Sequence, residues 1–464
     1  MIIWNSKILA KVLKSETSKS QIINNISINS KIIKKNCLFI PIKGKRFDGH
    51  DYIQEAFNNG AKLSLVQKKS LSSVKLPSSL KKKLIIVEDT IISMETIARE
   101  ARNRAKKAVI IGITGSSGKT TLKNWTGEIL EKFFTIHKTI GNFNNQIGLT
   151  LSLSMMAESS KFGIFELGMN QKGEIRKLTK IVKPDISIIT NIAPAHIANF
   201  NSEIEIAEEK SCIFCENAEG IVILPRDSKY FKLLKMKAKK KSHKIYTFGT
   251  SKKSDFQFLG LVKKKEYSLV KFKILNEDFF IKNINLAEHL YLNICIIIGM
   301  AKILKINLSK LKEYLPLLSP IHGRGSIHKI IYKAKKITLI DDSYNSNPLS
   351  LEFSIKNLQT FNNYNRKICV IGDMLELGEQ SSKFHLNVVK ILCSERVDIV
   401  YTIGNFSKII SKNMPEKVIC EHFENLKSLE KEIFSKIQNN DLILIKGSNS
   451  LGLSKICKNL MENE

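Results

Sequence analysis

A glycine-rich loop that carries a lysine is the part of the sequence best suited to phosphate chemistry. It lies in the segment VIIGITGSSGKTT, residues 109–121, where an apolar run precedes the loop and an amphipathic pattern follows it. Backbone N–H groups of such a loop can surround a phosphate at the start of a helix. Lys119 would then reach the terminal phosphates, and the Thr120 hydroxyl would bind Mg²⁺. We therefore expect a nucleotide site here.

The loop departs from the common pattern GxxxxGK[ST], because Ile113 stands where the first glycine would be. A purely structural glycine loop is the alternative, but it would not require a strand before the loop and a helix after it. The residues expected to contact the nucleotide are Gly112, Thr114, Gly115, Ser116, Ser117, Gly118, Lys119, Thr120 and Thr121.

Three polar residues downstream of the loop have side chains that can bind metal ions or phosphates. Glu166 ends the run FGIFE, His196 ends the run TNIAPAH, and Lys210 lies in IAEEKS. A carboxylate at the carboxyl end of a parallel strand lies where such sheets bind their ligands. Taken singly, these residues could equally be a polar strand end, a structural histidine and a solvated lysine.

The form TGSSGKT resembles the phosphate loop of the Mur ligases and folylpolyglutamate synthases. This resemblance implies that Thr120, Glu166, His196 and Lys210 hold two Mg²⁺ ions, with Lys210 converted by CO₂ into a carbamate. The conversion replaces a cation with an oxygen ligand of the kind that hard metal ions prefer. It also implies that Asn293 contacts adenine, Arg324 the phosphates and Asp342 the ribose of ATP. The implied catalytic residues are Lys119, Glu166, His196, Lys210 and Arg324.

Other segments resemble the Mur ligase that joins D-alanyl-D-alanine to UDP-MurNAc-tripeptide. They are IKGKRFDGHD at residues 42–51, NFNNQIG at 142–148, DDSYNSNP at 341–348 and GDMLELG at 372–378. The resemblance implies an acyl-phosphate mechanism and closure of the domains on ATP, since Lys119 and Arg324 must meet at one nucleotide. The implied substrate-binding residues are Ser30, Phe47, Asp48, Gly49, His50, Asn144, Asn145, Asn345 and Asn347.

Short apolar runs that alternate with helical patterns must position these residues. Four such runs precede or follow the nucleotide loop, and four more follow Arg324, as expected for strands of parallel sheets. They are residues 109–113, 162–167, 186–190, 220–224, 336–340, 368–371, 399–403 and 442–445, and a buried helix is expected at 286–304. Strands alternating with helices predict right-handed βαβ units.

We therefore predict an α/β protein of three domains. Residues 1–85 would form a small UDP-sugar-binding domain, and residues 86–321 a P-loop-type parallel-sheet domain that binds ATP. Residues 322–464 would form a Rossmann-like domain that binds D-Ala-D-Ala and closes on ATP. A length of 464 residues agrees with about three domains of ordinary size.

The net charge of +31 could indicate a nucleic-acid partner. The lysines are scattered along the whole chain, however, without an aromatic-interleaved basic stripe, so we expect no nucleic-acid partner. A P-loop NTPase acting on nucleic acid, another ligase of the family and an inactive member are the competing interpretations. ATP hydrolysis that depends on nucleic acid or on a peptide substrate would separate the first of these from a ligase.

The remaining bulk features predict a cytoplasmic monomer that is not inserted in a membrane. No apolar stretch approaches the roughly 18 residues that span a bilayer, and the N-terminus lacks the pattern of a signal peptide. The eight cysteines are widely spaced, which does not indicate a disulfide framework. The Cys212-Ile-Phe-Cys215 pair falls in a helical pattern, and a structural role is expected for it.

Overall fold

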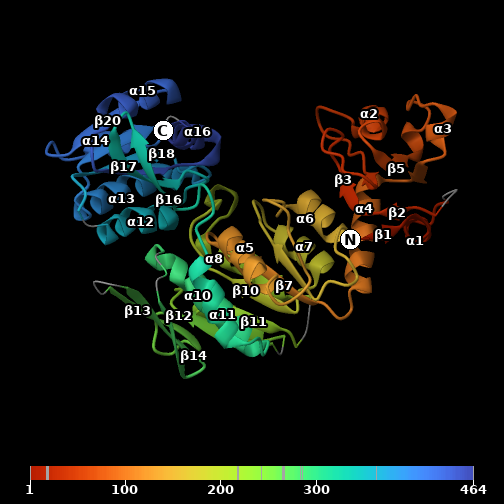
Figure 1. Ribbon diagram of the computed structural model, residues 1–464, viewed down its shortest axis with the longest axis horizontal. Coiled ribbons are helices and arrows are strands. Elements are labelled where there is room, and N and C mark those ends of the chain that lie inside the picture. Colours follow the sequence, from red (N-terminus) through yellow and green to blue (C-terminus); the bar gives the residue numbers. More distant parts are fainter. Residues whose placement is uncertain are drawn as a thin grey trace.

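The computed structural model describes residues 2–16, 20–216, 219–241, 243–263, 267–282, 284, 286–361 and 363–462. Three α/β units follow one another along the molecule (Figure 1). The N-terminal unit, in red, and the C-terminal unit, in blue, lie at opposite ends, and the central unit lies between them. The predicted three-domain α/β fold is confirmed.

The N-terminal unit is built on a parallel sheet with strand order β3-β4-β5-β6. Its strands are β3 (Asn25–Ser27), β4 (Cys37–Phe39), β5 (Ala61–Gln67) and β6 (Leu84–Val87), and a short antiparallel pair, β1 (Trp4–Asn5) and β2 (Ile22–Ile23), precedes them. Its helices are α1 (Ser6–Val12), α2 (Ile53–Asn58) and α3 (Ser78–Lys81). Helix α4 (Thr90–Arg104) packs against α1 and against α6 of the central unit, and so connects the two units.

The central unit contains a sheet with strand order β15-β14-β13-β12-β11-β10-β7-β9-β8. Pairing is parallel from β8 to β13 and antiparallel from β13 to β15. The strands are β7 (Val109–Thr114), β8 (Ile136–Lys138), β9 (Phe162–Glu166), β10 (Ile186–Ile189), β11 (Ile221–Pro225), β12 (Lys244–Gly249), β13 (Phe256–Lys263), β14 (Ser268–Ile274) and β15 (Glu277–Lys282). Strand β7 lies between β10 and β9, so the loop that follows it opens at the carboxyl edge of the parallel part.

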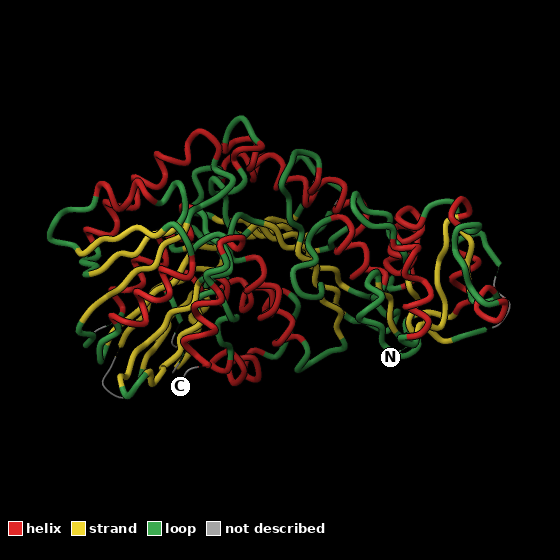
Figure 2. Tube along the Cα trace, turned by 90° about the horizontal axis from the view of Figure 1, so that it is seen from above, coloured by secondary structure: helices red, strands yellow, loops and turns green. Residues whose placement is uncertain are grey.

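Helices cover both faces of this sheet, as the red layers above and below the yellow strands in Figure 2 show. They are α5 (Lys119–Leu130), α6 (Gln146–Ser154), α7 (Glu174–Val182), α8 (Glu203–Ser211), α9 (Phe231–Lys239), α10 (Tyr291–Ile303) and α11 (Leu308–Tyr314). Adjacent residues of β7 face opposite sides: Ile111 packs in one apolar core with α5 and α10, and Ile110 in the other with α6 to α9. Burial on both faces explains why β7 is a continuous apolar run.

The C-terminal unit has a sheet with strand order β16-β17-β21-β18-β19-β20, in which only the β16–β17 pair is antiparallel. The strands are β16 (Ser326–Tyr332), β17 (Lys335–Asp342), β18 (Arg366–Gly372), β19 (Ile399–Ile403), β20 (Ile419–Phe423) and β21 (Asp441–Lys446). The helices are α12 (Pro348–Asn357), α13 (Ser381–Ser394), α14 (Lys408–Asn413), α15 (Leu426–Lys436) and α16 (Ser454–Glu462).

The predicted parallel strands are found within two residues of their expected ends. The helix expected at 286–304 begins later, because Ala287 is extended and a 3₁₀ turn, η5 (Glu288–Leu290), precedes α10. The eight cysteines are free, and Cys212 opens the 3₁₀ turn η4 (Cys212–Phe214), as its helical pattern predicts. None of the helices in the described ranges combines the length and apolar character needed to span a bilayer.

Candidate active site

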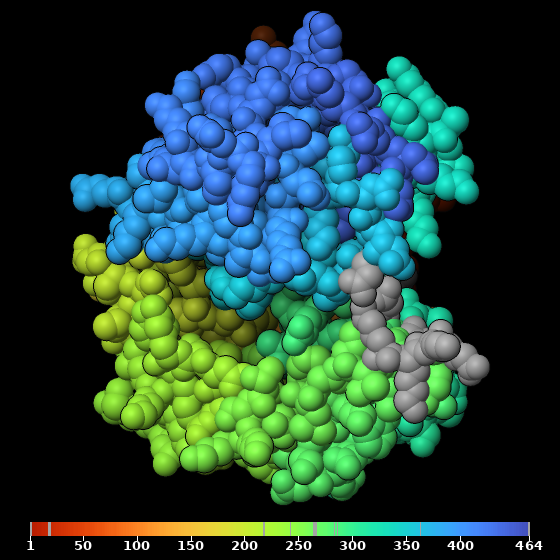
Figure 3. Space-filling model, turned by 90° about the vertical axis from the view of Figure 1, so that its left-hand side faces the viewer, coloured from red at the N-terminus to blue at the C-terminus, as the bar shows by residue number. Residues whose placement is uncertain are grey.

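A cavity of about 680 Å³ opens where the central and C-terminal units meet. In Figure 3 the C-terminal unit, in blue, sits on the central unit, in yellow and green, with a hollow between them. The wall from the central unit comes from the carboxyl ends of β7, β9 and β10 and the start of α5, and the other wall comes from the loops around β17 and α12. Ligands of open α/β sheets bind at this kind of edge.

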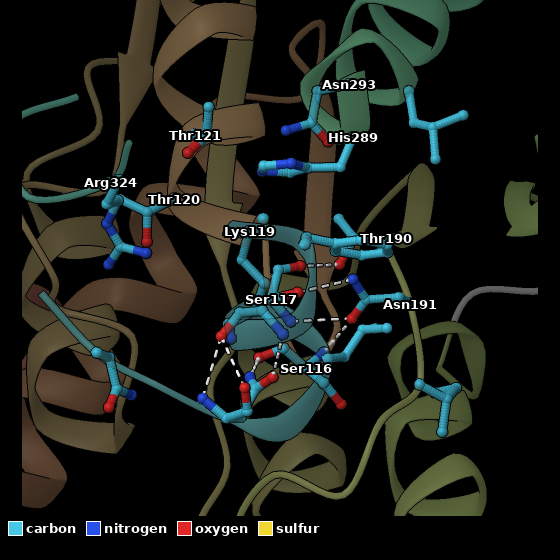
Figure 4. Close-up of a pocket in the computed structure, with 18 of the residues that line it drawn as sticks. Ser116, Ser117, Lys119, Thr120, Thr121, Thr190, Asn191, His289, Asn293 and Arg324 are labelled. Atoms are coloured by element: carbon cyan, nitrogen blue, oxygen red, sulfur yellow. Dashed lines mark hydrogen bonds between the residues drawn. The ribbon is translucent and has the colours of Figure 1, made fainter. Parts of the chain in front are cut away.

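The loop after β7 is held in shape by the segment that follows β10. The backbone N–H groups of Ser116 and Ser117 donate to Asn191 Oδ1 at 3.0 and 2.9 Å, and Thr190 Oγ1 donates to the Ser117 carbonyl at 2.6 Å (Figure 4). Gly115 has a φ of +148°, and a Cβ there would lie 1.9 Å from Thr190 Oγ1. Only glycine therefore fits at residue 115.

Two lysine side chains converge on one backbone carbonyl of this loop. Lys119 Nζ and Lys210 Nζ donate to the Gly115 oxygen at 2.9 and 3.1 Å. Burial lowers the pKa of the Lys119 amine, with Glu166 opposing this and Arg324 adding to it. Burial, with Lys119 as the next cause, lowers the pKa of the Lys210 amine well below its usual range. Because Lys210 is only 2% exposed beside another amine, its neutral form is favoured.

A pair of hard oxygen ligands lies beside the lysines. Thr120 Oγ1 donates to Glu166 Oε2 at 2.8 Å, and Asn144 Nδ2 donates to Glu166 Oε1 at 2.9 Å. Glu166 ends β9, and Thr120 lies in the first turn of α5, so the neighbouring strands β7 and β9 bring them together. Hydroxyl and carboxylate oxygens are the ligands that Mg²⁺ takes beside phosphates, so this donor set fits the ion that accompanies ATP.

The part of the cavity next to α10 and α12 has the groups needed to hold a planar base and a sugar. Asn293 of α10 lies beside Gly118, and the rings of His289 and Phe353 stack with their centroids 5.4 Å apart. Burial lowers the pKa of His289 to about 4, which keeps its imidazole neutral and suited to stacking. Asp342 accepts a hydrogen bond from Lys446 Nζ at 2.6 Å. This part of the cavity can therefore stack an aromatic base and offer a carboxylate to hydroxyl groups.

The C-terminal unit supplies a cation and several contacts to the phosphate loop. Arg324 lines the cavity with its guanidinium 4.0 Å from the centroid of the Tyr344 ring. Asn347, which caps α12, donates to the Ser116 carbonyl at 3.4 Å. Across the interface, the carboxylate of Glu376 in the C-terminal unit contacts Nδ1 of His196 in the central unit. The structure thus places groups of both units around one space.

Most of the predicted site residues lie in this cavity. Those that line it are Ser116, Ser117, Gly118, Lys119, Thr120, Thr121, Asn144, Glu166, His196, Lys210, Asn293, Arg324, Asp342, Asn345 and Asn347.

Four other predicted residues lie around the cavity but do not line it. Gly112 is inside β7, where a Cβ would meet Pro184 at 2.9 Å, and Thr114 donates to the Leu167 carbonyl. Gly115 contributes the carbonyl that the two lysines share. Asn145 caps α6 and faces a small adjoining hollow.

The residues predicted to bind the UDP moiety lie in the N-terminal unit, outside the cavity. Phe47 is 69% exposed, and the loop after it is fixed because Asp48 accepts from the His50 N–H and His50 Nε2 accepts from the Gln67 N–H. Gly49 has no room for a Cβ, which would meet the Ile42 nitrogen at 2.5 Å. Ser30 is buried and donates to Glu55 at 2.7 Å.

Several residues of the cavity were not among the predicted set. Asn191 lies two residues after the end of β10, so the rule that ligands bind at carboxyl strand ends could have found it. Lys446 ends β21 and could have been found in the same way. His289 and Phe353 also line the cavity, and Glu376 lies beside it in contact with His196. The contacts of these three residues join segments that are distant in the sequence, which local patterns do not predict.

A phosphate loop at the edge of a parallel sheet, completed by an arginine from another domain, defines a multidomain nucleotide-binding protein. Residues 22–111 match the catalytic domain of the Mur ligase family, 113–301 the Mur ligase middle domain, and 328–449 the Mur ligase glutamate ligase domain. These matches cover most of the 464 residues, and the chain belongs to the Mur ligase family.

Two relatives match this chain over nearly the whole length of both sequences. The UDP-N-acetylmuramoyl-tripeptide–D-alanyl-D-alanine ligase of Rickettsia prowazekii is 34% identical over 98% of this chain and 99% of its own. The Bacillus subtilis protein of that name is 30% identical over 100% of this chain and 99% of its own.

Two solved structures are similar throughout. The Thermotoga maritima MurF ligase in complex with ADP has a TM-score of 0.78 and 25% identity, over 95% of this chain and 97% of its own. Acinetobacter baumannii MurF, at 24% identity, has a TM-score of 0.83 over 99% of each chain, so the two proteins have the same fold.

Proposed function

We propose that this chain is an ATP-dependent amide ligase that adds D-alanyl-D-alanine to UDP-MurNAc-tripeptide during synthesis of the peptidoglycan precursor. The observation that carries the proposal is the meeting of Lys119, Arg324 and the Glu166–Thr120 pair in one cavity formed by two units. The names of the full-length relatives in Rickettsia prowazekii and Bacillus subtilis support the choice of substrates.

The reaction has two steps that need no side-chain nucleophile. The terminal carboxylate of the tripeptide attacks the γ-phosphorus of ATP, and the bond to the β-phosphate oxygen breaks, which releases ADP. The amine of D-Ala-D-Ala then attacks the acyl carbon, loses a proton, and displaces phosphate. Lys119 and Arg324 would neutralise charge on the transferring group, and the loop N–H groups would orient it. Mg²⁺, held by Thr120, Glu166 and His196, would screen the phosphate charge.

We also propose that Lys210 reacts with CO₂ to form a carbamate that serves as an oxygen ligand. The neutral amine favoured by its burial beside Lys119 is the form that attacks CO₂, and a proton is released as the N–C bond forms. The test is activity in buffer depleted of CO₂, which should fall and return when bicarbonate is added. Activity independent of CO₂ would contradict the carbamate.

The roles of the domains follow as part of this proposal. Residues 1–85 would hold the UDP moiety through Ser30 and the loop 47–50, and residues 86–321 would bind ATP. Residues 322–464 would close on ATP and receive D-Ala-D-Ala near Asn345 and Asn347, while Asn144 and Asn145 would contact the peptide. We propose that the protein acts as a monomer in the cytoplasm, where its nucleotide substrates are made.

The test is phosphate release by the purified protein with Mg²⁺-ATP and UDP-MurNAc-tripeptide, comparing D-Ala-D-Ala with single amino acids. Release should require the dipeptide and should fall by at least about 100-fold in Lys119→Ala and Lys210→Ala. Lys161→Ala, at an exposed position of the central unit, is the matched control and should retain activity. Release with a different acceptor would overturn the substrate, and release stimulated by nucleic acid would overturn the ligase.

A further inference from the structure

A contact between two strained residues joins the central and C-terminal units beside the cavity. His196 has a φ of +59° and Glu376 a φ of +64°, so both adopt the left-handed conformation without being glycine. The side chains meet at His196 Nδ1 and the Glu376 carboxylate. The backbones meet as well, because the Ala198 N–H donates to the Glu376 carbonyl at 3.1 Å. Strained residues of this kind persist where the surrounding structure fixes them, often at functional sites.

The loop that carries Glu376 is fixed by its own domain rather than by the contact. The Met374 N–H donates to His385 Nε2 at 3.0 Å, and the Leu375 N–H donates to Ser448 Oγ at 2.9 Å. The carboxylate of Asp373 accepts from the Phe406 and Ser407 N–H groups. These bonds fix the residues before Glu376, whose own side chain is 53% exposed and reaches the other unit. The loop therefore presents Glu376 as a preformed group.

The two sides of the His196 ring indicate what the Glu376 carboxylate does. One side of the imidazole faces the cavity that Lys119 and Lys210 also line, and the other side faces Glu376. With Nδ1 occupied by the carboxylate, Nε2 is the nitrogen left for a ligand. Histidines that hold metal ions commonly donate their other N–H to a carboxylate, which fixes the ring and raises its basicity.

We propose that Glu376 is a positioning residue that orients His196 and thereby couples the seating of the C-terminal unit to divalent-cation binding. This role of Glu376 rests on the proposed function, in which a divalent cation accompanies ATP at this site. When the C-terminal unit moves away, it removes Glu376 from His196 and weakens the cation site. Cation binding and domain seating consequently favour each other, as linkage requires.

The test uses Mn²⁺ with a non-hydrolysable ATP analogue, and bound Mn²⁺ is measured by electron paramagnetic resonance. Glu376→Ala should weaken Mn²⁺ binding by about 10–100-fold, and Glu376→Gln, which keeps the shape, should lie between it and the native protein. Glu379→Gln, three residues further along in the 3₁₀ turn η8 (Gly378–Gln380) and exposed, is the matched control and should leave binding unchanged. In a His196→Ala background, the Glu376 substitutions should have little further effect, because they act through the ring.

Two outcomes would overturn the proposal. One is Mn²⁺ binding by Glu376→Ala equal to that of Glu379→Gln; the other is a loss in Glu376→Ala that is undiminished in the His196→Ala background. Circular dichroism of each variant verifies folding, and if the alanine variant does not fold, the same comparisons are made with Glu376→Gln. The variants could show the expected differences in Mn²⁺ binding while the native protein released no phosphate with the tripeptide and D-Ala-D-Ala. That combination would contradict the proposed function and still support the role of Glu376.

Discussion

At the scale of single residues, the Gly115 carbonyl organises the cationic side of the cavity. It accepts hydrogen bonds from both Lys119 and Lys210, which holds the two amines close together in a buried place. Two ammonium groups in such a position repel each other, so the arrangement favours one charged and one neutral amine. Lys119 is the first residue of α5, and Lys210 is the more deeply buried of the two lysines. This division suits Lys119 to phosphate binding and Lys210 to chemical modification.

Asn191 gives a prediction for ATP affinity. Its amide oxygen accepts the N–H groups of Ser116 and Ser117, so it lies beside the place that phosphate oxygens would occupy. Asn191→Asp would keep the loop bonded but put a negative charge there, and ATP should bind at least about 10-fold more weakly. Titration of a fluorescent ATP analogue measures this. Asn58→Asp, which adds the same charge at an exposed position of the N-terminal unit, is the control. Equal affinity in both variants would contradict this role.

At the scale of elements, two short loops determine the geometry of the site. The turn from β7 into α5 depends on Gly115 and Gly118, whose φ angles are +148° and +79°. The turn after β18 depends on His385 of α13, which lies under the loop that carries Glu376. His385 is fully buried, donates from Nδ1 to the Ser381 carbonyl and accepts at Nε2, so its neutral tautomer is fixed by its partners.

His385 gives a prediction for stability against pH. Burial lowers its pKa from the ordinary value of 6.5, so below that pH the unfolded chain binds more protons than the folded one. Stability should therefore fall as the pH drops through about 6.5. Between about pH 7.5 and about pH 5.5 the native protein should lose up to about 1.4 kcal/mol more than His385→Gln, whose amide can accept the Met374 N–H without titrating. Thermal unfolding at the two pH values measures this, and equal losses would contradict it.

Sequence reasoning reached the elements and the loop residues because both follow local rules. The apolar run of β7, the glycines after it and the lysine that opens α5 lie within a single segment, and Glu166 was identified by its place at a strand end. The contacts across the interface could not be found in this way. Glu376 meets His196, and Phe353 stacks on His289, only because two separately folded sheets come together. The 3₁₀ turn before α10 was also missed, because its residues fit a helical pattern.

At the scale of the whole molecule, the site exists only where two units meet. Lys119 and Glu166 belong to the central sheet and Arg324 to the C-terminal unit, and a cavity of about 680 Å³ separates them. The N-terminal unit lies on the far side of the central one, so a substrate held at both ends must extend along the molecule (Figure 1). Such an arrangement allows substrates to enter when the C-terminal unit is displaced and excludes water when it is seated.

This arrangement predicts that ligands change the overall dimensions of the protein. Adding a non-hydrolysable ATP analogue with UDP-MurNAc-tripeptide should lower the radius of gyration, because Lys119 and Arg324 are drawn to one nucleotide. Small-angle X-ray scattering with and without the ligands measures the change. The same titration with Arg324→Ala should give a smaller decrease. Scattering curves that do not change on adding both ligands would contradict closure.

The central claim is that ATP activates the tripeptide carboxylate for attack by D-Ala-D-Ala. The most direct measurement uses UDP-MurNAc-tripeptide labelled with a heavy oxygen isotope in its terminal carboxylate, and mass spectrometry of both products. We expect the nucleotide product to gain the dipeptide, and the released phosphate to carry one labelled oxygen, because that oxygen bridges to phosphorus before the amide forms. Unlabelled phosphate, or a product lacking the dipeptide, would contradict the account.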